Sequence, residues 1–134
     1  MGVLAQIGLV AFGSALGGLL RWGVGVAFGR WFGIAFPWGT LFINVTGCLF
    51  LGWFATYLGE RIGREHAWLS RDDLRLLWAI GFTGAYTTFS TYEYEAHALL
   101  TDGFGFKGMT YLIGSVVLGL IAVRCGVMLA GGPK

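Results

Sequence analysis

The amino-acid sequence predicts an all-α integral membrane protein whose four transmembrane helices form a single domain over residues 1–134. Charged residues make up only 12% of the chain, whereas about 25% is usual in a soluble domain. The mean hydropathy is +0.71, and four apolar segments each supply the about 20 residues that a helix needs to cross the roughly 30 Å hydrocarbon layer. This composition excludes a soluble enzyme, a coiled coil and a disordered chain.

The four predicted spans cover residues 3–28, 37–58, 74–100 and 108–130. The first span continues past Arg21 without a small-residue cleavage site, so we expect a retained helix rather than a signal peptide. The second span opens with Pro37, which suits a first helical turn because the N–H that proline lacks would have no helical partner there. Half of the charged residues lie between residues 60 and 75, which predicts an aqueous loop before the third span.

Four crossings place both chain termini on the same side of the membrane. The cations outside the spans are Arg61, Arg64, Arg71, Arg75 and Lys134 on that side, and Arg30 and Lys107 on the other. Positively charged loops favour the cytoplasm. Because the excess is modest, insertion in both orientations, called dual topology, stays open.

Small residues recur four positions apart, a spacing that lets helix backbones approach closely in lipid. The pairs are Gly13 and Gly17, Gly25 and Gly29, and Ser115 and Gly119. They can serve packing within one protomer. Four spans enclose little interior of their own, so a polar pathway between protomers of a homo-oligomer is the other interpretation.

Several polar residues lie within the predicted spans, where they are costly and mark functional positions. Asn44 is in the middle of the second span, and Thr40 precedes it by one turn. Its amide can donate hydrogen bonds into a cavity or hold two helices together.

In the fourth span, Tyr111 and Ser115 share one helix face. Arg21 can extend to the interface or attract anions at a pore mouth.

The third span is an irregular membrane helix, because residues 81–95 contain two glycines, four threonines, a serine and two acids. This composition favours a break between Gly84 and Thr88. A break frees backbone carbonyl groups that must then face a ligand, water or protein, and a cluster of such carbonyls can bind a cation. The alternative is a continuous helix whose hydroxyl groups donate to the preceding turn.

Three segments together carry a family resemblance: residues 18–21 (GLLR), 38–47 (WGTLFINVTG) and 81–92 (GFTGAYTTFSTY). Their order, their spacing and the four-span frame resemble the Fluc (CrcB) fluoride channels over essentially the whole chain. The GTLxxN and TTFST strings are far more specific together than either is alone.

The resemblance implies an antiparallel dimer of four-span protomers, with two fluoride pathways at the dimer interface and a structural sodium ion at the dimer centre. Such a channel would export fluoride passively across a bacterial cell (inner) membrane and relieve fluoride toxicity. The pathway residues implied by motif position are Asn44, Phe89, Tyr92, Thr91, Tyr111, Ser115, Glu95 and Arg21. The backbone carbonyl groups of Gly84 and Thr87 from each subunit would hold the sodium ion.

Three positions depart from the family pattern. Tyr92 replaces the usual second phenylalanine of the third-helix motif, whose ring edges line the pathway. Ala85 stands where a glycine is common, and Gly119 replaces a hydroxyl residue at the end of the fourth-helix polar track. Fluoride is therefore expected to depend more on water near Gly119.

Two other functions compete with a fluoride channel. A small multidrug transporter also has four spans, but it needs a buried carboxylate in the first span, and residues 3–28 contain none. In a non-transporting assembly subunit, Asn44 and the third-span hydroxyl groups would only join helices. The sequence holds no motif of an enzyme, and the net charge of +2 without a basic run does not favour a nucleic-acid partner.

Overall fold

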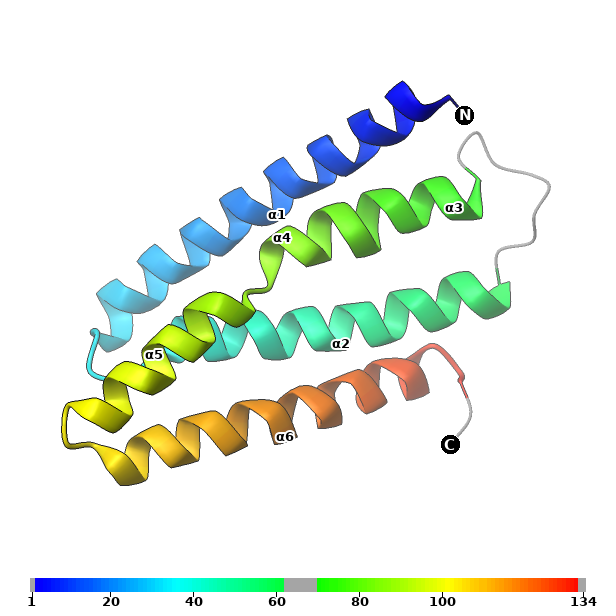
Figure 1. Ribbon diagram of the computed structural model, residues 1–134. Coiled ribbons are helices and arrows are strands. Elements are labelled where there is room, and N and C mark those ends of the chain that lie inside the picture. The colour runs from blue at the N-terminus through cyan, green and yellow to red at the C-terminus, as the bar shows by residue number, and fades with distance from the viewer. Residues whose placement is uncertain (1, 62–69, 133–134) are drawn as a thin grey trace.

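A computed structural model describes residues 2–61 and 70–132 of the chain, and these residues form a helical bundle (Figure 1). Helix α1 (Val3–Phe32) runs away from the N-terminus, α2 (Trp38–Arg61) returns, and α6 (Gly105–Leu129) ends near the C-terminus. Both termini lie at the same end of the bundle, as four crossings require. Residues 62–69 of the predicted charged loop, with Arg64, and the C-terminal Lys134 lie outside the described residues.

Four short elements in series occupy the region of the third predicted span. They are α3 (Arg71–Leu74), the π-helix η1 (Arg75–Thr83), α4 (Gly84–Tyr86) and α5 (Phe89–Thr101). A capping box starts the series, because the Asp73 N–H donates to Ser70 Oγ and the Ser70 N–H donates to Asp73 Oδ2. Between α4 and α5 the backbone is extended at Thr87 (φ −79°, ψ 160°) and at Thr88 (φ −148°, ψ 119°).

Three of the described helices are long and apolar enough to cross a membrane: α1, α2 over Trp38–Gly59, and α6. Residues 74–100 do not add a fourth continuous helix of that length, because the extended residues divide them. Large apolar side chains point outward on all three helices, including Leu4, Trp53 and Leu129.

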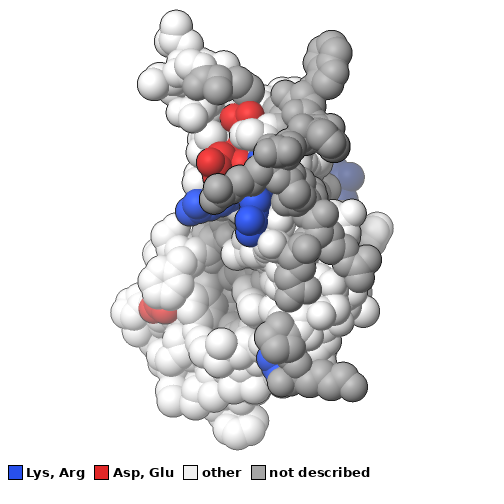
Figure 2. All heavy atoms as spheres, turned by 90° about the vertical axis from the view of Figure 1, so that its right-hand side faces the viewer, with Lys and Arg blue, Asp and Glu red and all other residues white. Residues whose placement is uncertain are grey.

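Figure 2 faces the end with both termini, where acidic and basic side chains lie close together. The chain is therefore a multi-pass membrane protein.

The helix boundaries differ from the predicted ones by a few residues. Helix α1 continues beyond the predicted end at Phe28, so Arg30 lies in its last turn rather than in a loop. Gly33 ends the helix with φ +73°, a conformation that favours glycine, and its N–H donates to the Gly29 carbonyl. Helix α2 begins after Pro37, whose carbonyl accepts from the Leu41 N–H.

The two halves of the third segment pack against different helices. The elements η1 and α4 lie along α1, whereas α5 lies along α6. Gly13 and Gly17 provide the close approach of α1, since a methyl group at either position would overlap the backbone of residues 77–86. Glycines also bring the parallel helices α2 and α6 together, with Gly52 against Val123 and Gly126 against Leu49. The Gly13 and Gly17 pair thus serves packing within the protomer.

Replacing Gly17 by alanine should destabilise the bundle, because the new methyl group would overlap the carbonyl oxygen of Phe82 and separate α1 from η1. Overpacking of this kind costs about 1–3 kcal/mol. The matched control is Gly8→Ala on the same helix, where a methyl group would meet no described atom within 4 Å. Thermal unfolding in detergent should show a lower midpoint for Gly17→Ala alone. Equal midpoints for both variants would contradict the packing described here.

Candidate functional site

The side chain of Asn44 binds the backbone at the point where the third segment is extended. Its Nδ2 donates to the Thr88 carbonyl oxygen at 3.0 Å, and its Oδ1 accepts from the Thr88 N–H at 2.9 Å. In a continuous helix the Thr88 N–H would donate to the Gly84 carbonyl. The amide of Asn44 therefore replaces a helical hydrogen bond, and it leaves the Gly84 carbonyl without its helical donor.

Other polar groups surround the same two extended residues. Arg21 reaches from α1, and its Nη1 donates to the Thr87 carbonyl at 3.5 Å. The Thr87 hydroxyl donates to the Thr83 carbonyl at 2.9 Å. The Thr88 hydroxyl accepts from the Thr91 N–H and donates to the Thr91 hydroxyl at 3.0 Å, which caps α5. Side chains of α1, α2 and α5 thus converge on Thr87 and Thr88.

Glu95 joins three helices one turn further along α5. Its Oε1 accepts from the Thr40 hydroxyl of α2 at 2.8 Å, and its Oε2 accepts from the Tyr111 hydroxyl of α6 at 2.8 Å. Tyr111 is only 1% exposed, so this carboxylate lies at the boundary of the small hydrophobic core that Tyr92, Ala96 and Tyr111 form. Both carboxylate oxygens have hydroxyl donors, which is what a partly buried carboxylate requires.

The aromatic residues Phe89 and Tyr92 face different surroundings, although their ring centroids are 5.9 Å apart. Phe89 lies in the first turn of α5 and is 74% exposed. Tyr92 is 5% exposed, and its hydroxyl donates to the Leu112 carbonyl of α6 at 2.6 Å. The hydroxyl group that distinguishes Tyr92 from the usual phenylalanine is thus engaged within the protomer.

Ser115 follows Tyr111 by one turn on α6. Its Oγ is buried, and it has no hydrogen-bond partner among residues 2–61 and 70–132. A buried hydroxyl without a partner is costly, and such a group calls for water or an ion in its neighbourhood. Gly119, one turn further, approaches the thiol of Cys48 on α2.

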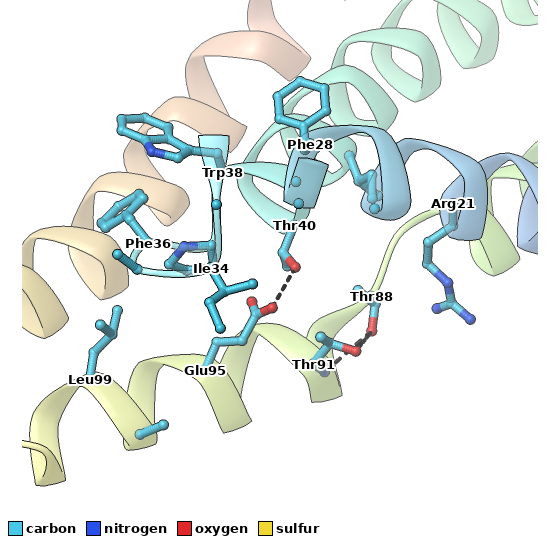
Figure 3. Close-up of a pocket in the computed structure, with 18 of the residues that line it drawn as sticks. Arg21, Phe28, Ile34, Phe36, Trp38, Thr40, Thr88, Thr91, Glu95 and Leu99 are labelled. Carbon is cyan, nitrogen blue, oxygen red and sulfur yellow. Dashed lines mark hydrogen bonds between the residues drawn. The ribbon is translucent and has the colours of Figure 1, made fainter. Parts of the chain in front are cut away.

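A pocket of about 710 Å³ collects part of the candidate site (Figure 3). Helix α1, the segment 33–37, the start of α2 and α5 line it. Its polar lining includes Arg21, Thr40, Thr88, Thr91 and Glu95. In Figure 3, Glu95 points across the pocket toward Thr40, while Arg21 lies at its other end beside Thr88.

The remaining predicted pathway residues are not part of this lining. They are Asn44, Phe89, Tyr92, Tyr111 and Ser115. Tyr111 nevertheless reaches the pocket through its hydrogen bond to Glu95, and Asn44 through its hydrogen bonds to Thr88.

A cation at Gly84 and Thr87 would have to bind backbone oxygens. Among residues 2–61 and 70–132, no three His, Cys, Asp or Glu side chains gather as a metal site. The extended backbone at residues 87 and 88 takes the Thr87 carbonyl out of the helical pattern, and the Gly84 carbonyl lacks its helical donor. Neutral carbonyl oxygens suit a hard monovalent cation such as sodium. The Thr87 carbonyl also accepts from Arg21 Nη1 at 3.5 Å, so a sodium ion bound there would share this oxygen with a guanidinium group.

Sequence reasoning missed Thr88 as a site residue. It supplies both backbone groups that Asn44 binds, and its hydroxyl caps α5. A threonine directly before the apolar Phe89, where α5 begins, is a helix N-cap signal that could have indicated this role.

The family comparison agrees with this arrangement of motifs. The family model described as "CrcB-like protein, Camphor Resistance (CrcB)" matches residues 8–127. A protein of Trichormus variabilis named "Fluoride-specific ion channel FluC" is 43% identical over 120 residues, which cover 90% of this chain and 84% of that protein. A protein of Nitrobacter winogradskyi with the same name is 42% identical over 120 residues, which cover 90% of each chain. The chain belongs to the CrcB family, as the motifs of its second and third spans indicated.

Proposed function

We propose that this chain is a fluoride-selective channel that lets fluoride leave the cell passively and so relieves its toxicity. The observation that carries the proposal is the Asn44 amide, a hydrogen-bond donor fixed at an extended backbone inside an apolar bundle. Relatives at about 40% identity carry the name of fluoride-specific ion channels. A channel of this kind performs no covalent chemistry and is not an enzyme.

Fluoride is small and strongly hydrated, so its passage requires groups that replace its water shell. The Asn44 amide has two N–H donors, and the Thr88 carbonyl accepts from only one of them. Threonine and serine hydroxyl groups and the positive edges of aromatic rings can also donate to an anion. Larger halides would fit this donor geometry poorly.

We propose that the working unit is an antiparallel homodimer of four-span protomers, with a pathway at its interface. The pathway residues are Arg21, Asn44, Phe89, Thr91, Tyr92, Glu95, Tyr111 and Ser115. In one protomer Phe89 is 74% exposed, although it lies within the predicted third span, next to the two extended residues. A second copy that covers this face would enclose the exposed ring with the polar groups around Thr88.

A sodium ion bound by the carbonyl groups of Gly84 and Thr87 would stabilise the dimer centre and offset the charge of a nearby anion. The chain's own part is to present those oxygens, since Asn44 binds the Thr88 N–H that would otherwise occupy the Gly84 carbonyl. We place the channel in the inner membrane of a bacterium, where an inside-negative potential favours anion exit by about 2.3 kcal/mol per charge per 100 mV.

The direct test is fluoride efflux from liposomes that contain the purified protein, measured with a fluoride-selective electrode. Rapid efflux of fluoride with slow efflux of chloride supports the channel. Efflux of neither ion, from protein that is folded and dimeric, would favour a subunit without transport activity.

Replacing Asn44 by aspartate should abolish fluoride flux while the dimer still assembles. The carboxylate keeps the acceptor for the Thr88 N–H but loses both donors, and it places a negative charge beside the path of an anion. Thr46→Val on the same helix is the control, because the Thr46 hydroxyl contacts Tyr86 instead of the extended backbone. Normal flux in correctly folded Asn44→Asp would show that the amide only joins two helices.

The proposed sodium site predicts a stability that depends on sodium. Sodium should raise the thermal unfolding midpoint in detergent relative to N-methylglucamine at equal ionic strength. Thr87→Ser should keep this sodium effect and most of the flux, because it retains the backbone carbonyl and the hydroxyl that donates to Thr83. Identical midpoints of the native protein in both salts would argue against a bound sodium ion.

The aromatic residues give a third prediction. Phe89→Ile should abolish flux, because an aliphatic side chain has no comparably positive edge. Tyr92→Phe should remain active, since it loses only the hydroxyl bond to Leu112, whereas Tyr92→Ile should be inactive. Liposome flux measured on dimeric protein decides the matter. Substantial fluoride flux in Phe89→Ile would mean that the ring serves packing alone.

A further inference from the structure

A second pocket, of about 700 Å³, lies between α2 and the first elements of the third segment. Successive turns of α2 line this pocket with apolar side chains, namely Leu51, Phe54, Ala55 and Leu58. Ala79 of η1 faces them. None of these residues belongs to the candidate fluoride site.

The pocket is open toward the surroundings of the helices. Phe54 and Leu58 are 8% and 4% exposed and form its floor, whereas Leu51 and Ala55 are exposed. Residues 51 and 58 are seven positions apart on α2, which corresponds to about 10 Å along the helix axis. The apolar groove therefore extends over about two thirds of the roughly 15 Å hydrocarbon depth of one leaflet.

The groove has a polar rim at the end where α3 begins. Arg71 and Arg75 lie four residues apart, and both are exposed and line the pocket. Asp72 and Ser70 complete the polar lining. Among the described residues that line the pocket, two arginines and one aspartate give one net positive charge, at the end of the bundle that Figure 2 faces.

We propose that this groove binds an anionic phospholipid whose headgroup carries hydroxyl groups, such as phosphatidylglycerol. Two guanidinium groups match a phosphodiester, and basic pockets between transmembrane helices on one side of a membrane bind anionic headgroups. Headgroup hydroxyls can donate to Asp72, and an acyl chain covers the apolar wall from Leu58 to Leu51.

A lipid fits these observations better than a small anion does. The charged rim lies where α3 begins, near the end of the helices, and the apolar wall continues from it along α2 toward the middle of the bundle. Free phosphate would use only the rim. The site is separate from Asn44 and Thr88, so the inference does not depend on fluoride transport.

Native mass spectrometry of the detergent-solubilised full-length protein tests the inference. Phosphatidylglycerol should remain bound at lower added concentration than phosphatidylcholine or phosphatidylethanolamine of the same chain length. In the double variant Arg71→Ala/Arg75→Ala the apparent affinity for phosphatidylglycerol should fall by on the order of tenfold. Arg30→Ala, which removes an exposed cation at the other end of the bundle, is the matched control and should bind as the native protein does.

A second variant keeps both arginines and fills the groove. Ala55→Phe changes an exposed position, so the protein should fold, but its ring should block the acyl chain and weaken lipid binding. Addition of inorganic phosphate should not displace the lipid. Equal affinity for all three lipids, or unchanged phosphatidylglycerol binding in both the double variant and Ala55→Phe, would overturn the proposal.

Discussion

The backbone of Thr88 imposes the main constraint on this structure. Inside a membrane protein, an N–H or C=O group without a partner costs several kcal/mol, and an extended residue in a helical segment exposes both groups. The Asn44 amide binds both of them, at 2.9 and 3.0 Å. A side chain from α2 therefore replaces the hydrogen bonds that the interruption of the third segment removes from Thr88. An aliphatic side chain has no donor or acceptor for these two backbone groups, and a shorter side chain would not reach both of them.

That interruption lets one segment pack against two different helices. Before it, η1 and α4 lie against the glycine face of α1, and after it α5 lies against α6. Glu95 then fixes α5 by accepting from Thr40 and Tyr111 on opposite sides. The polar contacts of the candidate site are thus also the contacts that hold the bundle together, so its donor groups are rigidly placed.

Hydropathy and length predicted the helical membrane fold, because the spans of α1, α2 and α6 are continuous apolar runs. The family motifs indicated that Asn44 and Thr87 both belong to the functional site. No pattern in a single sequence, however, predicts the hydrogen bonds of Asn44 to Thr88 or of Thr40 to Glu95. Those partners are 44 and 55 residues apart, and only the packing of helices brings them together. The π-helical winding of residues 75–83 and the tight contact at Gly126 also arise from packing, since neither has a local signal.

The parallel pairing of α2 and α6 has a consequence for how the protein is made. Gly52 and Gly126 lie in the same interface, yet 74 residues of chain separate them. At a translation rate of about 5–20 residues per second, Gly126 is synthesised roughly 4–15 s after Gly52. During that interval the small-residue face of α2 is in the membrane without its partner, so the insertion machinery or lipid must shield it until the last helix arrives.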